Sequence, residues 1–231
     1  MCSSFREAPV DNWPYRRVVV LTGFSGTGKT GFLRRLDDLG EQTLDLERLA
    51  SHHGSAFGTI GRQPTNAAFA AAVTQAWHAT ASDRLLWVEE KAAYLGSVGI
   101  PLPLQRALAT APTLVLIATI DARVRRTCSE YADATPEELL AGLERVAPRL
   151  GPRRTQAVRR SLLIGDRAAA AELLLTYYDM AYARRAGLLQ RDLIGQASLE
   201  DDPLERVHAA ERWFEEQQQS SGPVVSEALG A

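Results

Sequence analysis

The stretch VVVLTGFSGTGKT, residues 18–30, constrains the fold more than any other, because an apolar run leads directly into a glycine-rich segment. Gly23, Gly28, Lys29 and Thr30 satisfy the pattern G-x-x-x-x-G-K-[ST]. In this pattern the glycines let successive backbone N–H groups converge on phosphate oxygens, and the helix that follows adds a favourable dipole. The stretch therefore predicts a strand over residues 17–22, a phosphate-binding loop and a helix that begins within the motif.

Lysine usage singles out one residue of this motif. Lys29 and Lys91 are the only lysines among 26 basic residues, so lysine is a rare choice in this chain. An ammonium is a compact charge that fits between phosphate oxygens, whereas a guanidinium is planar and wide. We therefore expect Lys29 to neutralise the terminal phosphates and the Thr30 hydroxyl to reach a Mg²⁺ ion. The predicted phosphate-binding residues are Gly23, Ser25, Gly26, Thr27, Gly28, Lys29 and Thr30.

Further strands and helices alternate along the chain. Short apolar runs predict strands over residues 43–46, 85–88, 113–120 and 192–196, and helical spacing predicts helices after residue 64, through 121–186 and over 203–216. This alternation predicts an α/β fold: a P-loop NTPase-like parallel sheet flanked by helices, with a helical segment inserted after the fourth strand. We expect an N-terminal extension (1–16), a single P-loop domain (17–216) whose residues 121–186 form a lid or acceptor-binding part, and a disordered tail (217–231).

Composition excludes several classes of protein. No apolar run reaches the roughly 20 residues that cross a bilayer, and the N-terminal residues have no signal-peptide core, so we expect a cytoplasmic protein without a membrane partner. Cys2 and Cys128 lie far apart in sequence and predict neither a disulfide framework nor a zinc site.

Charge is distributed unevenly along the sequence. The net charge of −2 gives no overall attraction for a polyanion, so a nucleic-acid partner would need a local basic patch. One run of arginines is a candidate, although at helical spacing such a run is more often a solvated face. Its members are Arg145, Arg149, Arg153, Arg154, Arg159 and Arg160.

Two acidic residues are predicted to lie near the loop. Glu89 and Glu90 end the strand over 85–88, and one of them is expected to bind Mg²⁺ with Thr30 or to orient water, with Glu89 the leading candidate. The loop itself recognises a phosphate chain and does not define a reaction, because kinases, NTPases and transferases that release diphosphate all use it.

A longer segment resembles a known family. Residues 44–69, LDLERLASHHGSAFGTIGRQPTNAAF, resemble the P-loop domain of tRNA 2-selenouridine synthase, in which a D-L-E-x-L-A-x-H-R-G-S-x-F-G block precedes Q-P and a phenylalanine. Similar family motifs follow in order: VEE at 88–90 with Gly96 and Pro101, the helix with Arg123, Arg126, Glu130 and Tyr131, Arg149-Leu150-Gly151, and YYDMAY at 177–182. The resemblance covers roughly residues 17 to 185.

The resemblance implies a reaction on tRNA. In this family the sulfur of 2-thiouridine is alkylated with a geranyl group from geranyl diphosphate, and selenophosphate then replaces the S-geranyl group. The loop phosphate would then be a leaving group, and Lys29, the loop amides and Mg²⁺ would stabilise it. The resemblance gives as catalytic candidates Lys29, Asp45, Glu47, His52 and Glu89, and as substrate-binding candidates His53, Ser55, Glu90, Arg123, Arg126, Tyr178 and Tyr182.

The chain also departs from the family pattern. We expect no rhodanese domain within these 231 residues, so selenium transfer is expected to need a separate rhodanese protein. His53 stands where the family has arginine, and Lys91, Ala92 and Ala93 stand where it has an acid and an S-R pair. Three hypotheses remain: the geranyl diphosphate–dependent tRNA enzyme, a diverged prenyltransferase that alkylates sulfur on another acceptor, small molecules included, and a kinase or NTPase that binds ATP or GTP.

Overall fold

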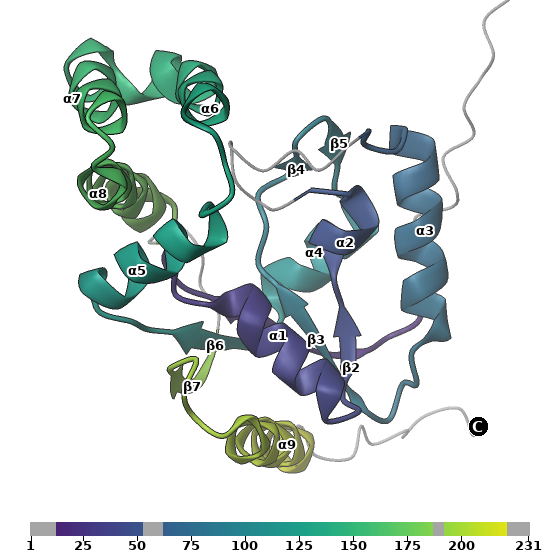
Figure 1. Cartoon of the computed structure of the whole chain (residues 1–231). Coiled ribbons are helices and arrows are strands. Elements are labelled where there is room, and N and C mark those ends of the chain that lie inside the picture. Colours follow the sequence, from purple (N-terminus) through teal and green to yellow (C-terminus); the bar gives the residue numbers. More distant parts are fainter. Residues whose placement is uncertain (1–12, 53–61, 187–191, 221–231) are drawn as a thin grey trace, which may run out of the picture.

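The structure, a computed structural model, describes residues 13–52, 62–186 and 192–220. Within these residues five parallel strands form the main sheet, in the order β2-β3-β1-β6-β7 (Figure 1). Their bounds are β1 (Arg17–Thr22), β2 (Gln42–Leu44), β3 (Leu85–Glu89), β6 (Thr113–Leu116) and β7 (Leu193–Ala197). Strand β1 pairs with β3 on one side and with β6 on the other. The chain order therefore reverses beside β1, the place where open α/β sheets bind ligands.

Helices cover both faces of this sheet. They are α1 (Lys29–Asp38), α2 (Leu46–Ala50), α3 (Asn66–Ala79), α4 (Leu102–Thr110), α5 (Ile120–Glu130), α6 (Pro136–Leu150), α7 (Pro152–Leu163), α8 (Arg167–Ala186) and α9 (Pro203–Ser220). A small antiparallel pair, β4 (Tyr94–Leu95) and β5 (Val98–Gly99), follows β3.

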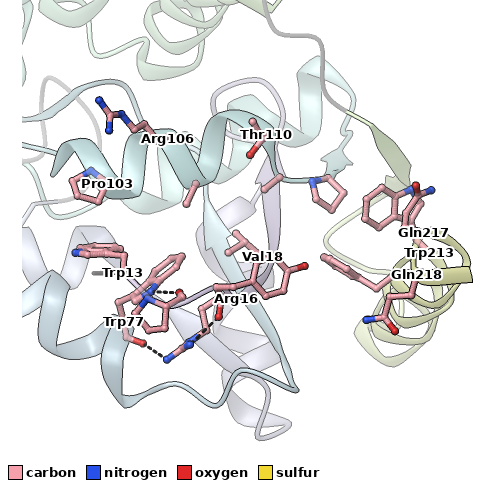
Figure 2. A pocket seen from close by; sticks show the side chains of 16 residues that line it. Trp13, Arg16, Val18, Trp77, Pro103, Arg106, Thr110, Trp213, Gln217 and Gln218 are labelled. Atoms are coloured by element: carbon pink, nitrogen blue, oxygen red, sulfur yellow. Dashed lines mark hydrogen bonds between the residues drawn. The ribbon is translucent and has the colours of Figure 1, made fainter. Parts of the chain in front are cut away.

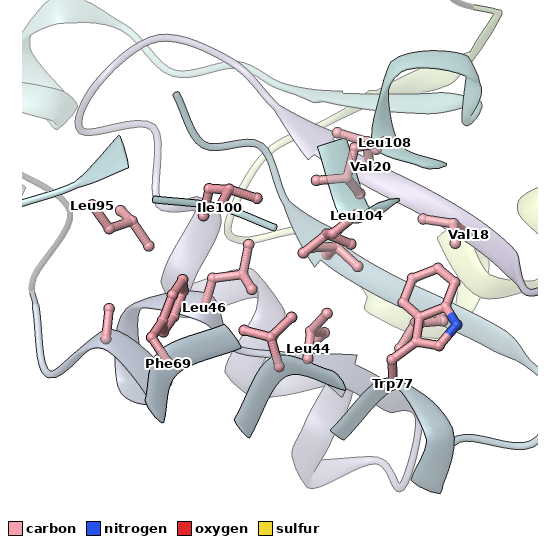
Figure 3. Packing of buried hydrophobic residues seen from close by; sticks show 14 of the residues in the cluster. Val18, Val20, Leu44, Leu46, Phe69, Trp77, Leu95, Ile100, Leu104 and Leu108 are labelled. Atoms are coloured by element: carbon pink, nitrogen blue, oxygen red, sulfur yellow. The ribbon is translucent and has the colours of Figure 1, made fainter. Parts of the chain in front are cut away.

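The buried residues of β1 divide the core into two clusters. Val18 and Val20 face a cluster that includes residues of α2, α3 and α4, among them Phe69 and Trp77 (Figure 3). Val19 and Leu21 point to the other face, where residues of α1 and α9 pack against the sheet. A strand that is buried on both faces reads as a continuous apolar run, which is why residues 18–21 are all hydrophobic.

Helices α6, α7 and α8 have a core of their own. Figure 1 shows α6 and α7 projecting away from the sheet, with α8 and α5 between them and β6. The buried members of this cluster are Leu143, Val146, Leu150, Val158 and Ala170. Thr135 begins α6 with a capping box, in which its hydroxyl accepts from the Glu138 N–H and the Glu138 carboxylate accepts from the Thr135 N–H.

The predicted fold class is confirmed, and the structure corrects several boundaries. The second strand, predicted to reach residue 46, ends at Leu44, because the Asp45 side chain accepts a hydrogen bond from the Arg48 N–H and caps α2. The fourth ends at Leu116, since Thr119 caps α5 in the same way. Helix α4 and the β4–β5 pair were not predicted. Helix α9 continues to Ser220, so residues 217–220, which we expected in the tail, are helical.

Candidate functional site

The phosphate-binding loop connects the end of β1 to the start of α1. Gly23 has φ +134°, and a Cβ there would lie 2.3 Å from the main-chain oxygen of Leu116, so only glycine fits. Gly28, with φ +95°, is the N-cap of α1. The N–H groups of the first helical turn have no intrahelical partners, so the loop places free donors and the positive end of the helix dipole where an anion can bind.

The Lys29 side chain lies within this loop. Its Nζ donates to the carbonyl oxygens of Gly23 and Phe24, both at 2.8 Å. An ammonium has three N–H donors, so one can still meet a phosphate oxygen. Burial lowers the pKa of Lys29 below its ordinary value, and the nearby Glu89 carboxylate partly offsets this effect. The loop therefore holds the Lys29 ammonium on two of its own carbonyl oxygens, with one N–H donor left for a phosphate.

Thr30 and Glu89 provide a pair of oxygen atoms that fits Mg²⁺. The Thr30 hydroxyl donates to Glu89 Oε2 at 2.7 Å, which places the start of α1 against the end of β3. A threonine hydroxyl, a carboxylate oxygen and phosphate oxygens form a donor set that Mg²⁺ accepts. When bound, the ion would neutralise negative charge on the phosphate oxygens. Because the other Glu89 oxygen accepts from Lys91, Glu89 is expected to offer the ion a single oxygen.

Lys91 belongs to this site, although no motif of the sequence assigns it a role. Its side chain is 9% exposed, and its ammonium forms ion pairs with Glu47 of α2 and, at 2.6 Å, with Glu89. Burial by itself would raise the pKa of Glu89, but Lys91 and Lys29 outweigh it, and the pKa is lowered. For Glu47 the balance is opposite, because burial outweighs the attraction of Lys91 and raises the pKa. Both lysines of the chain thus lie at the carboxyl end of the sheet, and the rarity that drew attention to Lys29 applies equally to Lys91.

The other residues of the D-L-E-x-L-A-x-H block support this arrangement. Asp45 is the N-cap of α2, the helix that carries Glu47. His52 is buried, its N–H donates to the Glu47 carbonyl oxygen at 3.0 Å, and its ring lies against Gly96, where a Cβ would be 2.8 Å from His52 Cδ2. Gln63 links these segments, since its side chain donates to the Ala50 carbonyl oxygen and accepts from the Ser97 N–H. His53 and Ser55, both predicted substrate-binding residues, lie outside the described residues.

Glu90 belongs to a different cluster from Glu89. Its carboxylate accepts hydrogen bonds from the hydroxyl of Thr22, the last residue of β1, and from Tyr182 of α8 at 3.1 Å. The Tyr182 and Thr22 hydroxyls also contact each other. Burial raises the pKa of Tyr182, which keeps its proton on the phenol. Tyr182 therefore attaches α8 to the strand that leads into the loop.

Two arginines of α5 hold the loop from the opposite side. Arg123 donates through Nε to the Ser25 carbonyl oxygen at 2.8 Å and forms a bidentate ion pair with Asp179 at 2.8 and 2.6 Å. Arg126 donates to the Gly26 carbonyl oxygen at 2.5 Å. These donors go to loop carbonyls, so the structure places both arginines in contact with the loop backbone. The two residues match the predicted R-x-x-R motif, but Asp179 was not assigned a role from the sequence.

Loop residues that were predicted to bind phosphate also have internal contacts. The Thr27 side chain is buried, and its hydroxyl donates to the Phe24 carbonyl oxygen at 2.9 Å. The Phe24 ring is 38% exposed and lies edge-on to Tyr182, with 5.4 Å between ring centroids, and under the Arg123 guanidinium at 5.3 Å. The loop therefore has an aromatic surface beside its phosphate-binding backbone.

Tyr178 lies apart from this cluster, one helical turn before Tyr182. Its ring meets Tyr177 edge-on, with centroids 5.5 Å apart. Burial raises the pKa of Tyr178, and the charge of Arg149 partly offsets that effect. The structure therefore places Tyr178 beside the end of α6, and its predicted contact with substrate stays a prediction.

A large cavity lies at the other edge of the sheet. Its volume is about 680 Å³, and its aromatic lining includes Trp13, Trp77 and Trp213 (Figure 2). It opens beside Arg16 and Val18, at the start of β1, whereas the phosphate-binding loop follows the end of the same strand. This cavity is therefore separate from the candidate site.

A parallel sheet, a glycine-rich loop at the end of its central strand, and a threonine–glutamate pair beside that loop define a P-loop α/β domain. The sequence model described as the tRNA 2-selenouridine synthase AAA domain matches residues 16–202. The chain belongs to this family.

Curated relatives carry the same family name. The tRNA 2-selenouridine synthase of Bordetella petrii is 32% identical over 199 residues, which cover 71% of this chain and 52% of that protein. The one of Cupriavidus necator is 33% identical over 183 residues, covering 75% of this chain and 47% of that protein. The chain therefore spans about half the length of the curated relatives it matches.

Among solved structures, a shikimate kinase from Acinetobacter baumannii in complex with shikimate aligns with 92% of this chain and 98% of its own. Its sequence identity is 15% and its TM-score 0.35, and we draw no argument from a similarity at this level. None of the helices in the described residues is long and apolar enough to span a membrane.

Proposed function

We propose that this domain binds the diphosphate of a prenyl donor, geranyl diphosphate, and transfers the prenyl group to the sulfur of 2-thiouridine in tRNA. Membership of the tRNA 2-selenouridine synthase family is the observation that carries the proposal. The site supports it, because Lys29, the loop amides and the Thr30–Glu89 pair lie together where a diphosphate and its Mg²⁺ would bind. Selenium transfer would need rhodanese chemistry from outside residues 1–231.

The proposed step is a substitution at an allylic carbon. The thiocarbonyl sulfur attacks C1 of the geranyl group, the C1–O bond breaks, and its electron pair leaves with diphosphate. Loss of the N3 proton of the base to water leaves a neutral S-geranyl product. The loop stabilises negative charge on the leaving group, and Lys29 meets its terminal oxygens. Since sulfur is already a good nucleophile, the protein's main tasks are to position the two substrates and to stabilise the diphosphate.

An aromatic surface beside the loop favours a prenyl chain as the group attached to the diphosphate. The exposed Phe24 ring and Tyr182 lie next to the phosphate-binding backbone. Contact with an isoprenoid chain would remove apolar surface from water, at about 25 cal/mol for each Å² buried. Phe24→Ala is therefore expected to weaken binding of geranyl diphosphate while leaving inorganic diphosphate unaffected.

Thermal denaturation with a panel of ligands tests the donor. With Mg²⁺ present, geranyl diphosphate at 100 times its Kd should stabilise the domain by about 2.7 kcal/mol. For a domain of this size that corresponds to a rise in Tm of roughly 5–10 °C. Lys29→Ala should abolish the shift. Stabilisation by ATP or GTP and none by geranyl diphosphate would refute the prenyl proposal and favour the kinase or NTPase alternative.

Mass spectrometry tests the acceptor. After incubation with the protein and geranyl diphosphate, tRNA that contains 2-thiouridine should gain the mass of one geranyl group, whereas the same tRNA with uridine should not. If geranyl diphosphate binds but this tRNA gains no mass, the acceptor is a different sulfur compound. That outcome would favour the diverged prenyltransferase, for which small thiols and thioamides are the compounds to test next.

A further inference from the structure

An arginine-rich surface covers the far end of the helical segment. Residues 145–160 contain six arginines and no acidic residue, although the net charge of the whole chain is −2. The charge of the protein is therefore strongly asymmetric, with +6 in these 16 residues and a net −8 in the remainder. Five of the six arginines are exposed in the structure; we call them the arginine surface: Arg145, Arg149, Arg153, Arg154 and Arg160.

The turn between two helices gathers part of this surface. Helix α6 ends at Leu150 and α7 begins at Pro152, so Arg149, Arg153 and Arg154 surround the single connecting residue, Gly151. Arg160 follows Arg153 by seven residues, which is about two helical turns and places both on the same side of α7. The charges are therefore close together in space as well as in sequence.

Two tyrosines of α8 lie against this turn. The Tyr177 hydroxyl donates to the Arg149 carbonyl oxygen at 2.8 Å, and the Arg154 guanidinium lies 5.9 Å from the centre of the Tyr177 ring. Tyr178 meets Tyr177 edge-on and lies close enough to Arg149 for its charge to affect the phenol. Both rings are partly exposed. Aromatic rings and arginines thus occur together here.

Helix α8 connects this surface to the phosphate-binding loop. Tyr178 precedes Tyr182 by four residues, about 6 Å along the helix axis. Asp179 lies between them and holds Arg123, which in turn contacts the Ser25 carbonyl oxygen of the loop. Helix α8 therefore carries both a tyrosine that contacts the arginine surface and the residues that hold the loop and β1 in place.

We propose that the arginine surface, together with Tyr177 and Tyr178, binds the phosphate backbone and unstacked bases of a single-stranded RNA segment. This inference rests on the proposed function, in which the acceptor is a base of tRNA. Guanidinium groups bind phosphates in a bidentate manner, and bases of RNA loops stack on tyrosine rings. Backbone contacts of this kind position the RNA, so the target base can be presented at the loop.

A triple variant tests the proposal. Arg149, Arg153 and Arg160 form neither an ion pair nor a side-chain hydrogen bond within the described part of the chain, so their replacement by glutamine should leave the fold intact. The matched control is Arg34→Gln/Arg106→Gln/Arg212→Gln, which removes three other exposed arginines from α1, α4 and α9. Equilibrium binding of tRNA that contains 2-thiouridine is measured at several salt concentrations for the wild type and both variants.

The expected result is a loss of affinity together with a weaker salt dependence. Each phosphate contact on single-stranded nucleic acid contributes about 0.7 to the slope of log K against log salt, so losing three contacts should lower the slope by about 2. The affinity gap between the wild type and the test variant should then shrink roughly 16-fold between about 50 and 200 mM salt. The control variant should keep the wild-type slope to within about 0.5.

Two results would overturn the proposal: wild-type protein that does not bind this tRNA, or test and control variants that lose affinity equally. Geranyl diphosphate binding, measured by thermal shift on the same three proteins, separates this failure from failure of the proposed function. If all three proteins bind the diphosphate but the test and control variants have the same affinity for tRNA, the assignment of the arginine surface is wrong and the loop assignment stands. If none binds the diphosphate while the tRNA results are as expected, the prenyl donor is wrong and the surface stands.

Discussion

Replacement of Lys91 by methionine gives the sharpest test of the site's electrostatics. The Lys91 side chain is 9% exposed, and its ammonium pairs with the carboxylates of Glu47 and Glu89, whose side chains are 13% and 8% exposed. Methionine has a similar length but no charge, so Lys91→Met leaves two carboxylates facing each other away from water. Removing one partner of a buried ion pair costs about 3–5 kcal/mol. The expected fall in Tm is roughly 6–20 °C.

The pH dependence of this destabilisation follows from the direction in which the pKa of each paired group is shifted. The pKa of Glu89 is lowered from 4.5, so its contribution is present above pH 4.5 and is lost as the pH falls through the lowered pKa. The pKa of Lys91 is raised from 10.5, so its contribution is present below pH 10.5 and is lost as the pH rises through the raised pKa. The pKa of Glu47 is raised, so Glu47 takes up its proton, and loses its attraction to Lys91, already above pH 4.5. The difference in unfolding free energy between the wild type and Lys91→Met should therefore be largest above the raised pKa of Glu47 and below pH 10.5, and it should shrink as the pH falls.

Urea denaturation in EDTA, followed by tryptophan fluorescence, measures this difference in the absence of metal. Lys91→Met combined with Glu47→Gln should recover part of the lost stability, because only one carboxylate then remains ionised. Lys91→Arg keeps the charge and should fall between the wild type and Lys91→Met. The reasoning is refuted if Lys91→Met unfolds within about 1 kcal/mol of the wild type at pH 7, since that cost is ordinary for any substitution, or if the difference does not shrink below pH 4.5.

Three further results are expected. Gly23→Ala should abolish diphosphate binding, because its Cβ would lie 2.3 Å from a main-chain oxygen of β6, whereas Gly40→Ala, with open space around the Cβ, should retain binding in calorimetry. Asp179→Asn removes the bidentate partner of Arg123 and should lower the unfolding free energy by about 1–3 kcal/mol in urea titrations. The affinity for geranyl diphosphate should begin to fall below pH 10.5 as the pH rises, because burial lowers the pKa of Lys29; an affinity that stays constant up to pH 10.5 would contradict this assignment.

The phosphate-binding half of the site could be predicted because its determinants are local. Residues 17–30 combine a strand that is buried on both faces, glycines at positions with positive φ and the start of a helix, and each of these features is visible in the sequence itself. The alternation of strands and helices also predicted a parallel sheet, since crossover connections require it. Short elements were missed: two-residue strands such as β4 and β5 have no periodicity to detect.

The contacts that complete the site could not be predicted from the sequence, because they join segments that lie far apart along the chain. Arg123 and Ser25 are 98 positions apart, and Thr22 and Tyr182 are 160 apart. Lys91 could be seen as a rare lysine and as a departure from the family pattern, yet its two carboxylate partners come from different elements, β3 and α2. Asp45 shows the reverse case, because a residue singled out by a motif turned out to cap a helix.

The separate core of α6, α7 and α8 has a consequence for how the molecule opens. Cooperative units in native proteins exchange their amide hydrogens together, and a cluster with its own buried side chains can open while the rest stays folded. Strand β1 contributes buried residues to both clusters of the sheet. The unit formed by α6, α7 and α8 is joined to the loop and to β1 through Arg123, Asp179 and Tyr182. Amide hydrogen exchange should therefore be faster in α6 and α7 than in β1 and β3. Each opening of the helical unit would also loosen the backbone of the phosphate-binding loop.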